Sequence, residues 1–341
     1  MTTITDLFAG AGGSSTGAVE AGITVRLAAN HWPIAVETHQ ANHPGADHDC
    51  ADLSQVNPRR YPRTDLLWAS PSCTHHSRAQ GVARDTTPVH AATHRGRVEW
   101  GAVRDAEPDR SRATMFDVIR FAECHGYDGI VVENVPEVRD WRLWPWWWSA
   151  MTDGLGYRGR VDVISASRCA TTGPAAPQSR IRMYAQFWRG SHAPAPLVEA
   201  DSEPAAWHAL DPDPGPLITE RTRPLAAATT ARIRATLDRY PQARRMIVSY
   251  YGSTRVGRPA SAPLPTMTTH DRCAVITRSP RGIHYRMLTV AEQARAMGFP
   301  DTYRWCGTRS DQVKQIGNAV CPPAARDVLA GLVTACGEVA A

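Results

Sequence analysis

The residue with the clearest chemical use is Cys73, which follows the apolar run Leu66-Leu67-Trp68-Ala69 and the break Ser70-Pro71-Ser72. A short apolar run that ends at a turn signal is typical of a buried parallel strand. Cys73 is then expected at the carboxyl edge of a sheet, where open α/β folds bind their ligands. A thiol there is a candidate nucleophile if its surroundings favour the thiolate. The alternative is a structural cysteine, since free cysteines are among the most buried residues.

A carboxylate and an amide end a second apolar run, Gly129-Ile130-Val131-Val132-Glu133-Asn134. Buried strands rarely finish in such groups unless the charge has a partner. Glu133 and Asn134 are therefore candidate site residues, at the same edge of the sheet as Cys73.

A glycine-rich turn follows the first predicted strand, in the order Phe8-Ala9-Gly10-Ala11-Gly12-Gly13-Ser14-Ser15. Strand, glycine turn and helix form the layout of a nucleotide-cofactor site, because glycines let a ligand approach the backbone at a helix N-terminus. The third glycine of the dinucleotide fingerprint is missing, since Ser15 stands there, and no phosphate-loop motif is present. Taken alone, the turn is a weak signal.

Aromatic and acidic residues follow the next two predicted strands: His31 and Trp32 after the second, and Asp52 and Leu53 after the third segment. Such residues commonly hold the ribose and the adenine of a cofactor. The structural alternative is that Trp32 belongs to the core and Asp52 caps a helix.

The apolar runs predict an α/β fold. Strands are expected at 3–8, 25–29, 66–69, 129–134, 161–165 and 182–188, and helices at about 13–21, 33–42, 111–125, 289–297 and from Pro322 onward. The long polar stretch 74–108 is expected to be a functional lid or disordered. Five tryptophans between 141 and 148 either stack on bases or pack a helix on the sheet, and packing is the preferred interpretation.

The stretch 189–285 is rich in Pro, Thr and Arg and is predicted to be a second, irregular domain. Twelve arginines and two acids lie in 221–281, whereas 199–220 holds six acids and no arginine. Clustered positive charge favours a polyanionic partner more than the total of +5 does. An arginine-rich composition can also reflect a GC-rich genome.

The 341 residues include 43% hydrophobic residues and eight cysteines without paired C-x-x-C spacing. A disulfide framework and a zinc cluster are therefore not expected. Cys73-Thr74-His75-His76 lacks a second Cys/His pair that would complete a metal site, so no metal is predicted. No signal peptide and no membrane span are expected, which indicates a cytoplasmic protein.

Six blocks of the sequence, in order, resemble the C5 DNA-cytosine methyltransferase family. They are Asp6 to Gly13, Ser70-Pro71-Ser72-Cys73, Glu133-Asn134-Val135, Gln178-x-Arg180-x-Arg182, the block from Arg286 through Gly298-Phe299-Pro300, and Gly317-Asn318-Ala319-Val320. Six motifs in family order are specific, whereas any one alone is not.

The resemblance implies a Rossmann-like, S-adenosylmethionine-dependent methyltransferase domain formed by 1–188 and 286–341, with a target-recognition domain at 189–285. It implies methyl transfer to C5 of a cytosine flipped out of double-stranded DNA, with S-adenosylhomocysteine as the by-product. A monomer is expected, and the resemblance also allows a cognate restriction endonuclease as a partner.

The same resemblance gives the site residues their roles. Cys73 would attack C6 of the cytosine, Glu133 would act at N3, Arg180 would contact the base, and Asn134 and Arg182 would support the site. The cofactor would be held by Phe8, Ala9, Gly10, Gly12, Gly13, His31, Trp32, Asp52, Leu53, Ser70, Asn318 and Ala319.

Three positions depart from the family pattern: Ser72 replaces a proline, Thr74 replaces a glutamine, and His31 replaces a ribose-binding glutamate. Alternatives are a tRNA-directed member of the family, a non-catalytic DNA-binding relative, and a nicotinamide oxidoreductase, which the later motifs disfavour. His31 also leaves room for an altered cofactor and a different transferred group.

Overall fold

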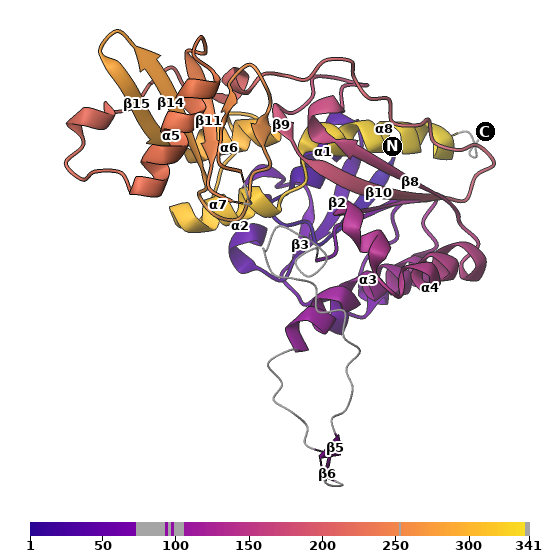
Figure 1. Cartoon of the computed structure of the whole chain (residues 1–341). Coiled ribbons are helices and arrows are strands. Elements are labelled where there is room, and N and C mark those ends of the chain that lie inside the picture. The colour runs from indigo at the N-terminus through magenta and orange to yellow at the C-terminus, as the bar shows by residue number, and fades with distance from the viewer. Residues whose placement is uncertain (73–92, 95–96, 99–105, 252–253, 338–341) are drawn as a thin grey trace.

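A seven-stranded sheet forms the centre of the molecule, with the strand order β3-β2-β1-β4-β7-β10-β8 (Figure 1). The computed structural model describes residues 1–72, 93–94, 97–98, 106–251 and 254–337. Neighbouring strands from β3 to β7 are parallel, and β10 is antiparallel to both β7 and β8. The strands are β1 (Thr3–Leu7), β2 (Thr24–Ala29), β3 (Asp47–Asp49), β4 (Leu66–Ala69), β7 (Gly129–Asn134), β8 (Arg158–Ser165) and β10 (Ile181–Trp188).

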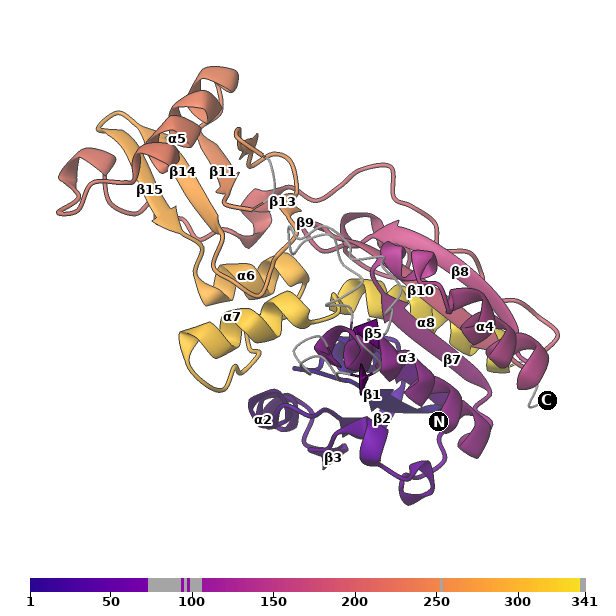
Figure 2. The ribbon, with the colours of Figure 1, turned by 60° about the horizontal axis from the view of Figure 1, so that its bottom comes forward.

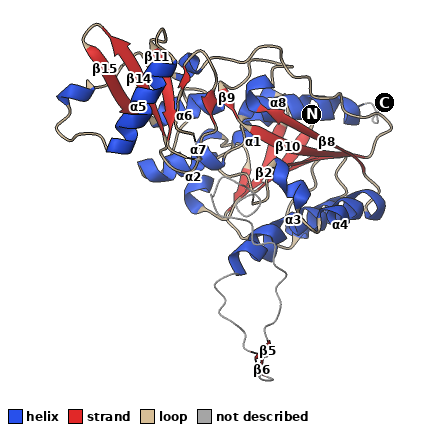
Figure 3. Ribbon diagram, in the orientation of Figure 1, coloured by secondary structure: helices blue, strands red, loops and turns tan. Residues whose placement is uncertain are grey.

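Helices cover both faces of this sheet (Figure 3). Alternate residues of β4 point to opposite faces: Leu66 and Trp68 pack with α1 and α8, and Leu67 and Ala69 pack with α3 and α4. A strand buried on both sides reads as a continuous apolar run, which explains its sequence. The helices of this domain are α1 (Gly13–Glu20), α2 (Pro33–Asn42), α3 (Ala106–His125), α4 (Trp144–Ser149), α6 (Val290–Met297), α7 (Arg309–Asn318) and α8 (Pro322–Gly337).

The predicted elements are present, and the α/β fold class is confirmed. The helix expected at 111–125 begins five residues earlier, at Ala106, so Ser111 lies inside α3 and is not its cap. Trp147 is fully buried against Phe187 of β10, which confirms that this tryptophan packs on the sheet. The segment 74–105, apart from β5 (Thr93–His94) and β6 (Arg97–Val98), lies outside the described residues.

The order of the strands reverses between β1 and β4. The chain moves from β1 outward through β2 and β3, then returns to β4 on the other side of β1. At this switch point the Ser70 N–H donates to the Leu7 carbonyl at 3.1 Å. Open α/β sheets bind ligands at the carboxyl ends of the strands that meet here.

The glycine turn between β1 and α1 has a left-handed backbone at three positions, a conformation that glycine adopts most readily. Phe8 has a φ of +59°, Gly10 of +55° and Gly12 of +95°. A Cβ on Gly13 would lie 2.0 Å from the Val320 carbonyl oxygen. Gly13 therefore lets α1 approach the segment between α7 and α8.

The region expected to be irregular contains regular structure (Figure 2). Helix α5 (Ala227–Arg239) lies beside a four-stranded sheet with the order β12-β11-β14-β15, in which every neighbouring pair is antiparallel. The strands are β11 (Arg245–Ser249), β12 (Arg258–Pro259), β14 (Cys273–Ser279) and β15 (Gly282–Met287). Because β15 ends at Met287, this sheet extends two residues past 285; the boundaries of the two domains remain a prediction.

The two faces of this second sheet have different neighbours. Met246 and Ile276 pack with Ile233 of α5, whereas Ile247 and Val275 join the apolar core of the first domain. The second region is thus packed onto the first through one face of its sheet. Arg234, Asp238 and Arg239 of α5 are exposed on the outer side.

The C-terminal helices complete the first domain. Thr289 and Glu292 form a capping box at the start of α6, and Gly298 ends that helix in the left-handed conformation. Among the described residues, Arg309–Cys336, which includes α7 and α8, is long and apolar enough to cross a membrane by length and composition, a test that buried core helices also pass. Its apolar window is 72% buried in the protein, which accounts for its composition.

Three histidines pack beneath the glycine turn. His39 Nδ1 lies 2.8 Å from His48 Nε2, His39 Nε2 lies 2.8 Å from Ser15 Oγ, and His43 Nε2 lies 3.1 Å from Thr16 Oγ1. Burial lowers the pKa of all three imidazoles, that of His43 to about 4, and the neighbouring histidines add to the effect on His39. The cluster is therefore neutral at pH 7.

We expect acid to destabilise the protein through this cluster. The pKa of His43 is lower in the folded chain than its ordinary 6.5, so the unfolded state gains protons first as the pH falls from 6.5 toward 4. At pH 5.5 this costs about 1 kcal/mol relative to pH 7.5. Urea unfolding of wild type and of His43→Gln at both pH values measures this cost. The free energy of unfolding of wild type, relative to that of the variant, should fall by about 1 kcal/mol between pH 7.5 and pH 5.5. A difference independent of pH would contradict the prediction.

A matched pair of glycine substitutions tests the packing of the turn. Gly13→Ala should lower the free energy of unfolding by about 1–3 kcal/mol, because the new methyl group overlaps the backbone at Val320. A Cβ on Gly45 meets no atom of the described part of the chain within 4 Å, so Gly45→Ala should stay within about 0.5 kcal/mol of wild type. Urea unfolding of the two variants side by side is the measurement, and equal stabilities would contradict the contact.

Candidate active site

The residues just before Cys73 are fixed at the carboxyl ends of β4 and β7. Asn134, which is 1% exposed, donates from Nδ2 to the Pro71 carbonyl at 3.1 Å and accepts the Val135 N–H at 2.8 Å. The Ser72 N–H donates to Thr114 Oγ1 on α3 at 3.1 Å. Cys73 itself lies outside the described residues. The structure therefore shows the position of Ser72, the residue that precedes the predicted nucleophile.

Glu133 has an arginine partner on the neighbouring strand. Arg182 Nε lies 3.1 Å from Glu133 Oε1, and both side chains are at least 86% buried. A second nitrogen of this guanidinium, Nη1, donates to the Ile181 carbonyl at 2.7 Å. The pairing supplies the charge partner that a carboxylate at the end of a buried strand requires. It brings together two of the predicted site residues.

Arg180 lies inside the protein and holds backbone segments that are distant in sequence. Its guanidinium donates to the carbonyls of Met267 at 3.1 Å, Gly317 at 3.0 Å and Ala319 at 3.1 Å. The side chain is 3% exposed. Arg180 thus connects β10 with the loop after α7 and with the second region, while contact with a base remains a prediction.

Gln178, absent from the predicted site residues although part of a quoted motif, makes a second such connection. Its Oε1 accepts the Met267 N–H at 2.5 Å, and its side chain is fully buried. Gln178 is the first residue of β9 (Gln178–Ser179), which pairs in parallel with β13 (Leu264–Pro265). The sequence signal that could have identified Gln178 is its position as the first residue of the Gln178-x-Arg180-x-Arg182 motif.

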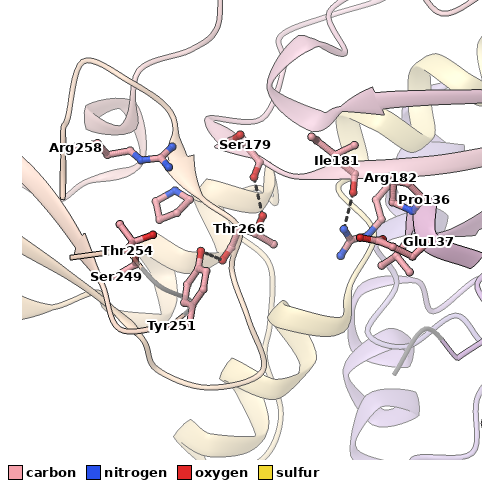
Figure 4. A pocket seen from close by; sticks show the side chains of 12 residues that line it. Pro136, Glu137, Ser179, Ile181, Arg182, Ser249, Tyr251, Thr254, Arg258 and Thr266 are labelled. Atoms are coloured by element: carbon pink, nitrogen blue, oxygen red, sulfur yellow. Dashed lines mark hydrogen bonds between the residues drawn. The ribbon is translucent and has the colours of Figure 1, made fainter. Parts of the chain in front are cut away.

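A cavity of about 460 Å³ lies between the two regions (Figure 4). Arg182, Ile181 and Glu137 line one side, next to the Glu133–Arg182 pair. Tyr251 and Arg258, which the sequence analysis did not single out, are on the side of the second region. They lie in the Pro-, Thr- and Arg-rich stretch, where no periodic pattern marks individual residues.

The residues predicted to hold a cofactor lie after the neighbouring strands β1, β2, β3 and β4. Phe8 to Gly13 follow β1, His31 and Trp32 follow β2, and Ser70 follows β4. Among the described residues, a Cβ on Gly10 would meet only the Phe8 carbonyl oxygen, at 4.0 Å, so these residues leave the turn open on that side. At the end of α7, Asn318 is exposed and Ala319 is buried. The next residue, Val320, packs with its backbone against Gly13 of the glycine turn.

Trp32 and Asp52 both have structural partners here. The ammonium of Lys314, the single lysine of the sequence, lies 4.4 Å from the centroid of the half-buried Trp32 ring. Asp52 is exposed and caps a short helical turn, accepting the Ser54 N–H at 3.1 Å and its hydroxyl at 2.8 Å. Leu53 is buried, and His31 is exposed.

Asp6, beneath the glycine turn, carries a perturbed carboxyl group. Ser14 and Ser15 donate their hydroxyl protons to Asp6 Oδ2 at 2.6 and 2.7 Å. Burial raises the pKa of Asp6 to about 6, against the effect of these hydrogen bonds. The Asp6 carboxylate thereby fixes the first turn of α1, which is its visible role.

Comparisons with known proteins find a family model and relatives that match most of the chain. The family model described as C-5 cytosine-specific DNA methylase matches residues 2–205 and 215–333. The type II methyltransferase M.HgiDI of Herpetosiphon aurantiacus is 25% identical over 92% of this chain and 89% of its own length. The type II methyltransferase M.NlaX of Neisseria lactamica is 24% identical over 96% of this chain and 95% of its own length. A 41-residue stretch is 56% identical to the rice DNA (cytosine-5)-methyltransferase CMT2, of which it covers 3%.

Solved structures share the fold. A variant of DNMT2 from Spodoptera frugiperda superposes with a TM-score of 0.65 at 14% identity, covering 97% of this chain and 99% of that one. Dnmt2 of S. pombe gives a TM-score of 0.60 at 16% identity, covering 98% and 99%. Because the family model spans nearly the whole sequence, the chain belongs to the C-5 cytosine-specific DNA methylase family.

Proposed function

We propose that the chain is a DNA (cytosine-5-)-methyltransferase in which Cys73 is the nucleophile and Glu133 acts at N3 of a flipped-out cytosine. The observation that carries this proposal is the Asn134–Pro71 hydrogen bond. It holds the residue two positions before Cys73 against the end of the strand that bears Glu133. A base that enters this edge of the sheet can thus meet both groups.

The chemistry requires both groups because C5 of cytosine is a poor nucleophile. Addition of the Cys73 thiolate to C6 forms a C–S bond, breaks the C5–C6 double bond and makes C5 electron-rich. The Glu133 carboxyl group places a proton at N3, where negative charge develops. After C5 has received a methyl group, loss of the C5 proton to a base expels the thiolate and re-forms the C5–C6 double bond, and the N3 proton returns to Glu133.

S-adenosylmethionine, when bound, supplies this methyl group from a positively charged sulfur. We propose Phe8, Gly10 and Trp32 as its principal contacts, with Asp52 toward the ribose. The open side of the turn at Gly10 and the half-buried Trp32 ring support this assignment. Mass spectrometry of the product base checks the transferred group, since the exposed His31 stands where the family has a glutamate.

Double-stranded DNA is the proposed substrate, bound across the cavity between the two regions. The basic stretch 221–281 supports a phosphate-binding role for the second region. The cost of extracting the base, a few kcal/mol, would be offset by closure of both regions on the DNA. By analogy with its type II relatives, we propose that the enzyme acts in the bacterial cytoplasm, as a monomer and with a cognate endonuclease as a candidate partner.

Replacing the nucleophile is the primary test. Cys73→Ala should lower methyl transfer at least about a thousandfold, because the covalent step is lost, while the Kd for DNA stays within about tenfold. Bisulfite sequencing of DNA from expressing cells locates the methylated site, and transfer to a duplex carrying that site gives the rate. The exposed Cys124 supplies the control, since Cys124→Ala should behave as wild type.

Robust methylation by Cys73→Ala would exclude the covalent mechanism. Transfer to tRNA but not to duplex DNA would instead favour the RNA-directed alternative. Binding without transfer by the wild-type chain would indicate a non-catalytic relative.

Arginine substitutions test the DNA-binding face. Arg258, which lines the cavity, should contribute one phosphate contact, so Arg258→Gln should weaken DNA binding and reduce the slope of log K against log salt by about 1. Arg26 is exposed on β2, away from this cavity, and Arg26→Gln should leave both quantities unchanged. Titrations of a labelled duplex at several salt concentrations measure them. Equal slopes for all three proteins would place DNA binding elsewhere.

A further inference from the structure

Both polar atoms of a single peptide group are held just before the predicted nucleophile. The group joins Pro71 to Ser72, and Cys73 is the next residue. Its carbonyl accepts a hydrogen bond from Asn134 Nδ2 at 3.1 Å, and its N–H donates to Thr114 Oγ1 at 3.1 Å. One restraint comes from β7 and the other from α3.

Two restraints on opposite edges fix the orientation of a peptide plane. The peptide unit is planar and rigid, so one hydrogen bond leaves it free to rock about that bond, and a second, from the other side, prevents this. The direction in which the chain leaves Ser72 is then set by the positions of Asn134 and Thr114. That direction determines where the following residue begins.

Both anchoring side chains stand on rigid parts of the fold. Asn134 is almost fully buried at the end of the central strand β7. Next to Thr114 on α3, Met115 is fully buried, and its carbonyl accepts the indole N–H of Trp147 at 2.7 Å. The helix bearing Thr114 is thereby locked to α4.

We propose that Thr114 is a positioning residue for the methyl-transfer reaction, acting through the Ser72 N–H to orient the chain at Cys73. This inference rests on the proposed function, in which Cys73 attacks the base. It also assigns a use to Ser72: a proline at this position has no N–H, so the hydrogen bond to Thr114 exists only because another residue stands there. Thr114 itself does not touch the substrate.

A pair of substitutions at Thr114 separates the hydroxyl from the shape of the side chain. Thr114→Val keeps the shape and removes the acceptor, whereas Thr114→Ser keeps the acceptor. We expect Thr114→Val to lower the single-turnover rate constant about tenfold, as loosened alignment of reacting groups does. Thr114→Ser should restore the rate to within about threefold of wild type. Thr334→Val on α8, where the hydroxyl donates to the Ala330 carbonyl, is the matched control.

The readout must distinguish positioning from stability. A duplex with 5-fluorocytosine at the methylated site traps the covalent complex, so the rate of trapping and the final trapped fraction are measured separately. For Thr114→Val the rate should fall, while the trapped fraction, the Tm, the KM for S-adenosylmethionine and the Kd for DNA stay at wild-type values. A wild-type trapping rate would overturn the proposal, and so would a lower trapped fraction together with a lower Tm, which would indicate loss of folded protein.

A double-mutant cycle with Ser72→Pro identifies the partner of Thr114. In the Ser72→Pro background the donor is absent, so Thr114→Val should cause no further loss. A further tenfold loss would show that Thr114 acts through a different group. If Ser72→Pro does not fold, the comparison of Val with Ser at position 114 still decides the proposal. Failure of the proposed function would instead appear as wild-type activity in Cys73→Ala.

Discussion

The buried guanidinium of Arg180 is the interaction on which the arrangement of the molecule depends. It donates to carbonyls of Met267, Gly317 and Ala319, which lie 87, 137 and 139 residues away along the chain. A buried cation is tolerated only when its donors find acceptors, and a planar guanidinium can serve several at fixed angles. Arg180 therefore determines how the second region and the loop after α7 meet the central sheet.

Thr266, which precedes Met267 in the second region, contacts both the Gln178–Arg182 motif and the wall of the cavity. Thr266 donates its hydroxyl to the Ser179 carbonyl at 2.7 Å and accepts, through its own carbonyl, the hydroxyl proton of Tyr251 at 2.8 Å. Tyr251 lines the cavity between the regions. The cavity wall at Tyr251 is thus two hydrogen bonds away from Ser179, the residue that precedes Arg180.

The middle of the central sheet could be predicted because β4 and β7 are buried on both faces and are therefore nearly continuous apolar runs. The carboxyl ends of these strands could be placed together for the same reason. The sheet of the second region could not, since β12 has only two residues and prolines and arginines interrupt any alternation. Both of its faces are apolar, one packed on α5 and the other on the first domain, and no local pattern encodes the second contact.

The partners of the site residues could not be predicted from the sequence either. The pairing of Arg182 with Glu133 depends on the antiparallel register of β10 against β7, in which Tyr184 stands opposite Glu133. Thr114 occupies an ordinary helical position, and its relation to Ser72 follows from how α3 crosses the sheet. In contrast, the block from Arg286 to Gly298 has a local basis: Thr289 and Glu292 cap α6, and Arg286 pairs with Glu292 at 2.7 Å.

The placement of Lys314 over Trp32 has a practical consequence. Because the sequence has no other lysine, an amine-directed reagent can acylate only this side chain and the N-terminal amine. The ε-amino group lies 4.4 Å from the ring proposed to contact the adenine. Isotope-coded acylation of this one amine, read out by peptide mass, would therefore report occupancy of the nucleoside site without any engineered label.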